Sequence, residues 1–339
     1  MEAVRDTFDW FYDSIKHGVF WATQKNPELA HTIFSGFCKG LYYCGLDKLV
    51  LDFEGSRDVE ISNAAGFNKN GDFPLRVLGY LGFSRSVVGT VSADAWEGNP
   101  KPRIVRYPET KSMVNWMGLP GVGCYIVREN LEKQEEKIPL TINIMGTPGK
   151  ESKERIKDLE RSIVTLRDLD YVDRFELNVS CPNTKGSSGD FDAREEYRRE
   201  LPNLLEVRGL IRIDQEFYVK VSPDIDEEEV DELVRLGKEF DVDGYTLTNT
   251  TTHHDIRFIP NSPRKGGASG DAVYERARAV QKMFYKKKKD SGLNFKIIAC
   301  GGINSLERLQ ERRELGAEEF QIYTPLIFEG FKLLRELRN

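Results

Sequence analysis

The chain has 339 residues and a formal net charge of -6. That length suits one large α/β domain with an appendage, and the acidic balance argues against a general nucleic-acid binder, because no surplus of cations exists to neutralise phosphates. The 5 cysteines and 4 histidines are scattered without metal-ligand spacing, so we expect neither a metal site nor a disulfide framework.

Residues 1–50 are expected to form an amphipathic helical segment. Apolar side chains recur at helical spacing over residues 8–22 and again over 29–42, with Asn26 as the cap of the second helix, Pro27 as its first residue and Gly45 as its stop. Such helices lie in a membrane interface or pack on a globular core, and the residues alone favour packing. No apolar run reaches the roughly 18 residues that a membrane-spanning helix needs.

From residue 61 onward, strand and helix patterns alternate. Strands are expected over residues 61–67, 86–92, 139–146, 174–180, 216–222, 244–250, 295–300 and 319–324. Helices are expected near 71–81, 122–136, 150–168, 194–213, 226–240, 271–289, 305–315 and 326–337. Eight repeats with near-continuous apolar strands predict an α/β fold, a (β/α)8 TIM barrel with an N-terminal helical extension. An open, doubly wound sheet is the alternative.

Two connections, 93–121 and 251–270, are longer than a barrel needs. Both follow a strand, so both are expected on the carboxyl face of the barrel, where barrel active sites are built. Long loops without clear secondary structure in a compact domain are usually functional.

Polar groups gather at the expected strand ends. Asn143, Asn178 and Asn249 offer paired donors and acceptors, which suit a flat ring with alternating C=O and N–H groups such as a flavin or a pyrimidine. Glycines at 266–270 and 301–302 suit a phosphate, because backbone N–H groups without a neighbouring Cβ can approach it closely. Together they indicate a phosphorylated cofactor.

Lys220 lies in a strand that otherwise reads as buried. A lysine inside a barrel is costly unless an anionic or electron-rich group meets it. A ligand role is therefore favoured, and a salt bridge to Asp224 is the alternative.

The segment 176–186 reads ELNVSCPNTKG, an apolar strand that ends in an amide, a hydroxyl, a thiol and a second amide. Such a cluster at the carboxyl end of a strand suggests a site. An ordinary exit from the strand into a turn is the alternative.

With these residues assembled, the chain resembles the dihydroorotate dehydrogenases, the FMN-dependent barrels of pyrimidine synthesis. The resemblance covers residues 27–330 approximately. It is carried by the segments 63–71, 97–103, 178–186, 248–251, 266–270 and 301–303.

The resemblance implies the roles of individual residues. The FMN set is Ala65, Gly66, Thr90, Asn143, Asn178, Lys220, Thr248, Gly270, Gly301, Gly302, Tyr323 and Thr324. The substrate set, for dihydroorotate and orotate, is Lys69, Asn115, Gly118, Leu119, Asn183, Asn249 and Thr250. Cys181 stands at the catalytic-base position and is expected to take a proton from C5 while hydride passes from C6 to the flavin. Lys220 is expected to stabilise negative charge on the flavin.

The N-terminal helices, Arg103, Arg106 and Tyr323 are similar to the membrane-associated class 2 enzymes, which reduce quinone. This similarity now favours membrane association, with residues 1–50 as the membrane and quinone access segment and 51–339 as the FMN-binding catalytic barrel. The implied location is a peripheral one on the cytoplasmic face of a membrane, or on the inner mitochondrial membrane if the source is eukaryotic.

Other residues depart from the class 2 pattern. Cys181 stands where class 2 has serine, the segment 115–120 looks like class 1, Gly121 replaces a substrate asparagine, and the arginine expected soon after Gly186 is missing. A soluble class 1-like enzyme using fumarate is therefore the nearest alternative. A flavin-free phosphate-binding barrel acting as a lyase or isomerase is the more remote one.

Overall fold

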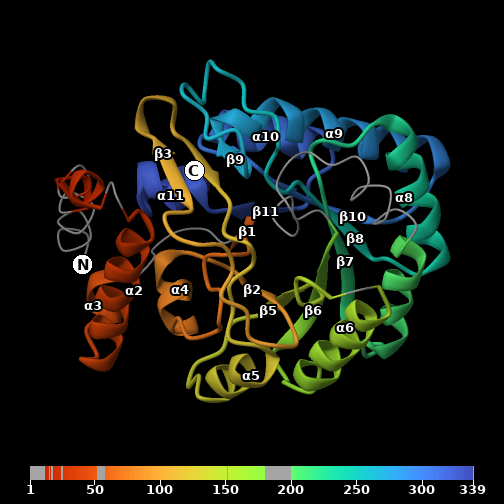
Figure 1. Cartoon of the computed structure of the whole chain (residues 1–339), viewed down its shortest axis with the longest axis horizontal. Helices are drawn as coiled ribbons and strands as arrows, with labels where there is room; N and C mark the ends of the chain where they lie inside the picture. The colour runs from red at the N-terminus through yellow and green to blue at the C-terminus, as the bar shows by residue number, and fades with distance from the viewer. Residues whose placement is uncertain are drawn as a thin grey trace.

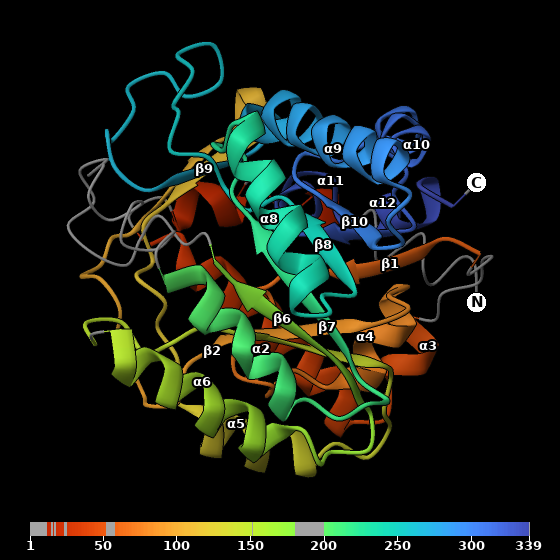
Figure 2. The same ribbon diagram turned by 90° about the vertical axis from the view of Figure 1, so that its right-hand side faces the viewer.

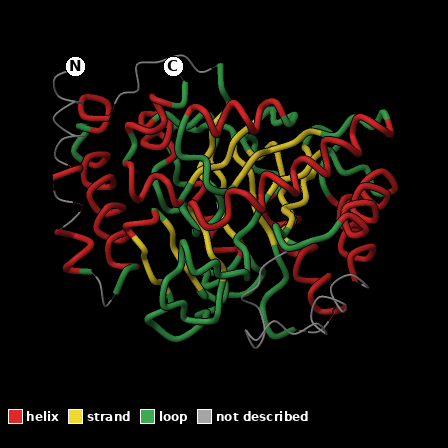
Figure 3. Tube along the Cα trace, turned by 90° about the horizontal axis from the view of Figure 1, so that it is seen from above, coloured by secondary structure: helices red, strands yellow, loops and turns green. Residues whose placement is uncertain are grey.

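The computed structural model describes residues 12–14, 16, 18–23, 26–51, 58–150, 152–179 and 200–338. At its centre lies a parallel sheet of eight strands, β1 (Glu60–Asn63), β2 (Ser86–Val91), β5 (Leu140–Ile144), β6 (Val172–Asn178), β7 (Glu216–Val221), β8 (Gly244–Leu247), β10 (Lys296–Cys300) and β11 (Glu319–Ile322). Their order is β1-β11-β10-β8-β7-β6-β5-β2. A bridge from Ser62 to Arg85 brings the two edge strands together, so the sheet closes on itself (Figures 1 and 3). The barrel is confirmed, and the open sheet is not formed.

Helices surround the strands (Figure 2). They are α4 (Leu75–Leu81), α5 (Cys124–Glu132), α6 (Ser152–Leu166), α8 (Glu227–Glu239), α9 (Asp271–Ser291), α10 (Leu306–Glu314), α11 (Thr324–Glu329) and α12 (Lys332–Glu336). Among them, α8 begins with a capping box, in which the side chains of Asp226 and Glu229 each accept a hydrogen bond from the other residue's backbone N–H. Of the helix expected over 194–213, residues 200–205 are helical, η2 (Glu206–Leu210) follows, and the first part lies outside the described residues.

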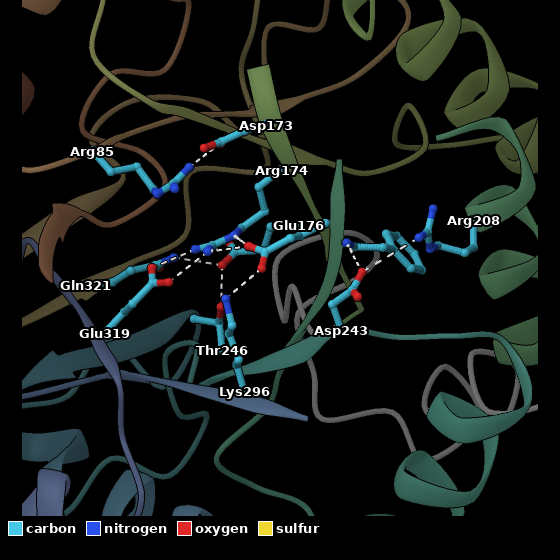
Figure 4. A network of polar contacts seen from close by, with 12 residues as sticks. Arg85, Asp173, Arg174, Glu176, Arg208, Asp243, Thr246, Lys296, Glu319 and Gln321 are labelled. Carbon is cyan, nitrogen blue, oxygen red and sulfur yellow. Dashed lines mark hydrogen bonds and ion pairs between the residues drawn. The ribbon is translucent and has the colours of Figure 1, made fainter. Parts of the chain in front are cut away.

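The barrel interior is more polar than the prediction of near-continuous apolar strands allowed. Side chains alternate across a strand, so Phe175 and Leu177 of β6 pack outward in the core, whereas Arg174 and Glu176 are part of a buried polar network (Figure 4). There Arg174 pairs with Glu216 and Glu319, each at 2.6 Å. The apolar expectation was therefore right for the outer face of this strand and wrong for its inner face.

The two long connections join in a second sheet, which the sequence did not predict. Its strands β3 (Ile104–Tyr107), β4 (Ser112–Asn115) and β9 (Gly267–Gly270) are antiparallel, with η1 (Pro108–Thr110) between β3 and β4. Val114, Trp116, Ile259 and Ala268 form its small core. Each strand has only four residues, too short for a clear alternating pattern. The expectation of loops without secondary structure was therefore wrong for these stretches.

The N-terminal region contains α2 (Glu28–Tyr43) and α3 (Asp47–Leu51), which lie at one edge of the molecule (Figure 1), where α3 packs against α4. Pro27 is the N-cap and no side chain caps the helix, so Asn26 is not the cap. Gly45, with φ +67, donates its N–H to the carbonyl of Tyr42 and confirms the predicted stop. The described part of 8–22 is largely helical, and residues 1–11 lie outside the described residues.

One face of this region packs on the barrel and the other stays exposed. Phe34 of α2 stacks on Phe331 with ring centroids 5.0 Å apart, and Cys38 is fully buried. Trp21 and Ile33, in contrast, are 81% and 50% exposed. Within the ranges described above, no helix combines the length and the apolar character needed to cross a bilayer.

Candidate active site

A cavity of about 850 Å³ opens at the carboxyl ends of the barrel strands. Of the predicted cofactor set, it is lined by Ala65, Gly66, Thr90, Asn178, Lys220, Thr248, Gly270, Gly301, Gly302, Tyr323 and Thr324. Of the predicted substrate set, it is lined by Lys69, Asn115, Leu119, Asn249 and Thr250. Asn143 and Gly118 do not reach its wall, and Cys181 and Asn183 lie outside the described residues. Residues far apart in the chain are thus brought together as the strand-end argument required.

Asn143, on β5, is fully buried, and its partner Glu176 lies beside the cavity-lining Lys220. Its Nδ2 donates to Oε1 of Glu176 at 2.6 Å, while its Oδ1 accepts no hydrogen bond from the residues that the structure describes. A buried carbonyl oxygen without a donor is costly. An N–H group that reached this oxygen would remove that cost.

Lys220 is 4% exposed and points into the same space. Its Nζ donates to Oε1 of Gln321 at 3.0 Å and lies 3.9 Å from Oε1 of Glu176. Asp224, the predicted alternative partner, instead accepts from Thr251 and Thr252. That alternative is wrong, because the carboxylate nearest to Lys220 comes from the neighbouring strand β6.

Glu176 organises this part of the interior and was missed as a functional residue. Besides Asn143, it accepts from Nε2 of Gln321 at 2.7 Å and from the hydroxyl of Thr246, and Figure 4 shows the three side chains converging. A signal existed in the sequence, because Arg174, Glu176 and Asn178 are polar at every second position of β6 and therefore share the inner face.

Two of the three predicted asparagines bond directly to each other. Nδ2 of Asn249 donates to Oδ1 of Asn178 at 3.2 Å, and Nδ2 of Asn178 donates to the hydroxyl of Thr90 at 3.2 Å. The backbone N–H of Thr250 donates to Oδ1 of Asn249 at 2.8 Å. The chain of amides fixes side chains from three strand ends before any ligand binds.

Glycine loops form another wall of the cavity. A Cβ on Gly302 would lie 2.7 Å from the carbonyl oxygen of Gly270, and one on Gly270 would lie 2.2 Å from that of Lys111. The loops after β9 and β10 thus approach each other as closely as only glycine permits. Gly266 lies against Asn115 instead and does not line the cavity. Of the glycines in the 266–270 loop, only Gly270 is therefore in place for the predicted phosphate role.

These features fit a phosphorylated flat heterocycle. The Oδ1 of Asn143, which no described residue pairs, and the ammonium of Lys220 suit the polar edge of a flavin ring, and the backbone N–H groups of the cavity-lining glycines Gly270, Gly301 and Gly302 suit a phosphate. In the part of the chain that the structure describes, no cluster of three or more His, Cys, Asp or Glu side chains could hold a metal ion.

Lys69 lies at the junction of the barrel and α2. Burial, together with the positive charges of Arg103 and Lys101, lowers the pKa of Lys69 to about 8, while Glu28 acts in the opposite direction. Because this pKa lies close to neutral pH, a neighbouring anion would stabilise the charged form of Lys69. Lys69 is therefore suited to a substrate carboxylate.

Arg103 and Glu28 connect α2 to the loop that carries predicted substrate residues. Nε and Nη2 of Arg103 bond to the two oxygens of Glu28 at 2.9 and 3.0 Å, and Nη1 donates to the carbonyls of Glu97, Asn99 and Met117. Burial alone would raise the pKa of Glu28, but Arg103 holds it below its ordinary value. The sequence suggested Arg103 but not its pairing with Glu28.

An apolar arm extends the cavity beneath the N-terminal helices. Its wall includes Val19, Phe20, Ala30, His31, Phe34, Phe37 and Leu326. Burial lowers the pKa of His31 to about 4, and its ring meets Phe67 and Tyr323 edge-on. His31 is therefore neutral near pH 7. Its uncharged ring lies where the apolar arm joins the polar pocket at the strand ends.

Comparison with known proteins identifies the same family that the residues of the site resemble. A family model described as dihydroorotate dehydrogenase matches residues 56–339. Dihydroorotate dehydrogenase (quinone) from Corynebacterium diphtheriae is 32% identical over 283 residues, covering 81% of this chain and 73% of that protein. The enzyme of the same name from Natronomonas pharaonis is 29% identical over 344 residues, covering 97% and 93%. A crystal structure of DHODH from Eimeria tenella in complex with ferulenol, 24% identical, has the same fold with a TM-score of 0.78 and coverage of 96% and 93%. The chain belongs to the dihydroorotate dehydrogenase family.

Proposed function

We propose that this chain oxidises dihydroorotate to orotate, a step of pyrimidine synthesis, with FMN as its flavin and a quinone as electron acceptor. The single observation that carries the proposal is the continuous cavity, which joins the polar strand-end pocket to the apolar arm under α2. A polar substrate and an apolar acceptor can thus reach one cofactor from different sides. Relatives named dihydroorotate dehydrogenase (quinone) support the quinone over fumarate.

Dihydroorotate dehydrogenases are generally flavin enzymes, and the described residues fit FMN in particular. The amides of Asn143 and Asn178 and the ammonium of Lys220 would hold the ring, while Gly270, Gly301 and Gly302 would hold the phosphate. Ala65, Gly66, Thr90, Thr248, Tyr323 and Thr324 complete the proposed set. When bound, the flavin supplies an acceptor for hydride.

The chain's own residues would handle the substrate and its proton. Oxidation of dihydroorotate forms the C5=C6 double bond by loss of a proton from C5 and a hydride from C6. Cys181, which lies outside the described residues, is the proposed base, because a thiol with an ordinary pKa of about 8.5 reaches its anionic form far more easily than a serine hydroxyl. Lys69 would bind the substrate carboxylate, with Asn115, Gly118, Leu119, Asn183, Asn249 and Thr250 around the ring.

The N-terminal region would deliver the quinone. The apolar arm lies between α2 and the barrel, and exposed side chains such as Trp21 and Ile33 lie on the outside of the same region. Aromatic and aliphatic residues of this kind suit a membrane interface. Residues 1–50 are accordingly proposed as the peripheral membrane and quinone segment, and 51–339 as the FMN-binding barrel.

The test separates the two half-reactions of the full-length protein. Purified protein should be yellow, its flavin should bleach on anaerobic addition of dihydroorotate, and a short-chain quinone should restore the colour faster than fumarate does. Replacing Ala30, on the wall of the arm, with Trp should slow reoxidation by quinone and leave bleaching unchanged. A colourless protein would refute the flavin proposal and return a lyase or isomerase to consideration. Faster recovery with fumarate would instead indicate the class 1-like alternative.

A further inference from the structure

Arg312 of α10 is a fully buried cation that the proposed chemistry does not use. Its guanidinium donates to the carbonyl of Leu247 at 2.6 Å, to those of Gly301 at 3.3 Å and Cys300 at 3.4 Å, and to the side-chain oxygen of Gln281. Over the described ranges, no carboxylate forms an ion pair with it. By contrast Arg308, one turn earlier on α10, pairs with Asp271 at 2.5 Å.

An arginine in this setting is costly, because taking a charge out of water is unfavourable unless an opposite charge compensates. Burial lowers the pKa of Arg312 to about 10, so the side chain still carries its charge at pH 7. Backbone carbonyls satisfy its donors without neutralising it. A full positive charge therefore remains behind the ends of β8 and β10.

The position of Arg312 relative to the glycine loop determines which backbone groups of the loop face away from the charge. In a trans peptide the C=O and N–H groups point in opposite directions. Because the carbonyls of Cys300 and Gly301 are turned toward Arg312, the N–H groups of Gly301 and Gly302 are turned away from it. Gly301 and Gly302 line the cavity, and Arg312 does not. The guanidinium thus lies directly behind the loop that is suited to a phosphate.

We propose that Arg312 is a positioning residue for the phosphate of FMN, acting through the loop in front of it. It orients the N–H groups of Gly301 and Gly302 toward the anion and adds a positive charge that no carboxylate of the described chain cancels. This inference rests on the proposed function. It predicts selectivity, because a phosphate monoester carries about -1.5 to -2 charges at pH 7, whereas riboflavin has the same ring and no phosphate.

The test compares FMN with riboflavin on the full-length chain after its flavin has been released. Both are titrated by fluorescence quenching into wild type, Arg312→Gln and Arg312→Lys. Wild type should bind FMN much more tightly than riboflavin. Arg312→Gln should lose about tenfold in FMN affinity, the scale of one charge interaction across roughly 10 Å of protein, with little change for riboflavin. Arg312→Lys keeps the charge and should keep most of the selectivity.

A second variant covers the case in which Arg312→Gln does not fold. Gln281→Glu keeps the guanidinium and places a carboxylate beside its Nε, so it should produce the same selective loss of FMN affinity. Because it also removes the two hydrogen bonds that Nε2 of Gln281 donates to the carbonyls of Arg312 and Leu315, Gln281→Met, which removes them without adding a charge, is its control and should keep the selectivity. Equal losses for both flavins, or equal losses in Arg312→Lys and Arg312→Gln, would overturn the role of the charge and leave only a structural arginine. A wild-type chain that binds neither flavin would refute the proposed function itself. A wild-type chain that binds both equally would refute the inference and the assignment of the phosphate to the glycine loop, and would leave the proposed flavin chemistry standing. A wild-type chain that prefers FMN, with a preference unchanged in Arg312→Gln, would refute the inference alone.

Discussion

Replacing Glu28 with Gln tests whether α2 is part of the active-site framework. The side chains of Glu28 and Arg103 are 18% and 6% exposed and form two charge-assisted hydrogen bonds. Bonds to charged groups contribute about 1.5–3 kcal/mol, and the acidic residue in the first turn of α2 adds roughly 0.5 kcal/mol through the helix dipole. Because Gln keeps one acceptor for Arg103, we expect a loss of about 2 kcal/mol in the free energy of unfolding.

The same substitution should shift the pH dependence of substrate binding. Glu28 raises the pKa of Lys69 against the effects of burial, Arg103 and Lys101. Without it, Lys69 loses its proton at a lower pH, so the affinity for dihydroorotate should start to fall below pH 8. The pKa of Glu28 is lowered in the folded protein. Its contribution to the free energy of unfolding is therefore fully present above the ordinary carboxylate pKa and is lost as the pH falls through the lowered pKa.

The assays are thermal unfolding and the dihydroorotate dependence of anaerobic flavin reduction, each over a pH series. Glu132→Gln is the matched control, because its pair with Arg128 is 48% and 34% exposed and an exposed pair contributes at most about 1 kcal/mol. If Glu28→Gln melts with the control and its pH profile does not move, α2 does not support the substrate loop as described.

Three further predictions concern the site itself. In wild type, the affinity for dihydroorotate should be level below pH 8 and fall above it as Lys69 becomes neutral. Lys69→Met should abolish this alkaline limb of the pH profile together with most of the affinity. Gly302→Ala should reduce FMN affinity by about tenfold or more, since φ is +69 and the added Cβ would lie 2.7 Å from a carbonyl oxygen. Cys181→Ala should slow flavin reduction by roughly two to four orders of magnitude, the scale of a lost general base, while reoxidation by quinone is unchanged.

Each of these has a control. Gly209, with no atom within 4 Å of an added Cβ, should accept Ala without loss of flavin, and a similar loss there would discount the Gly302 result. Persistence of the alkaline limb in Lys69→Met would assign it to another group. A Cys181→Ala enzyme that reduces its flavin at the wild-type rate would exclude the thiol as base.

The barrel was predictable because its signals are local. Each strand has an outward apolar face, and the longer helices have an apolar stripe, to which α8 adds a start signal in Asp226 and Glu229. The position of the site followed as well, since the carboxyl ends of parallel strands meet at one end of the barrel. Asn178 and Asn249, 71 residues apart, are accordingly hydrogen-bonded to each other.

Other features were not predictable, because they depend on register between strands or on side chains from distant segments. Lys220 faces Glu176 of the next strand and not Asp224 four residues away. The sheet of β3, β4 and β9 pairs segments about 150 residues apart, and none of its strands is long enough to be recognised alone.

What the sequence by itself determined about this protein is therefore the barrel, the end of the barrel that carries the site, and the chemical types gathered there. Only the tertiary structure decided which charges meet. Glu28 reaches Arg103 across 75 residues, and Arg312 reaches the carbonyls behind the glycine loop from the far side of β10. The physical reason is that periodicity and capping are properties of neighbours in the chain, whereas compensation of a buried charge is a property of neighbours in space.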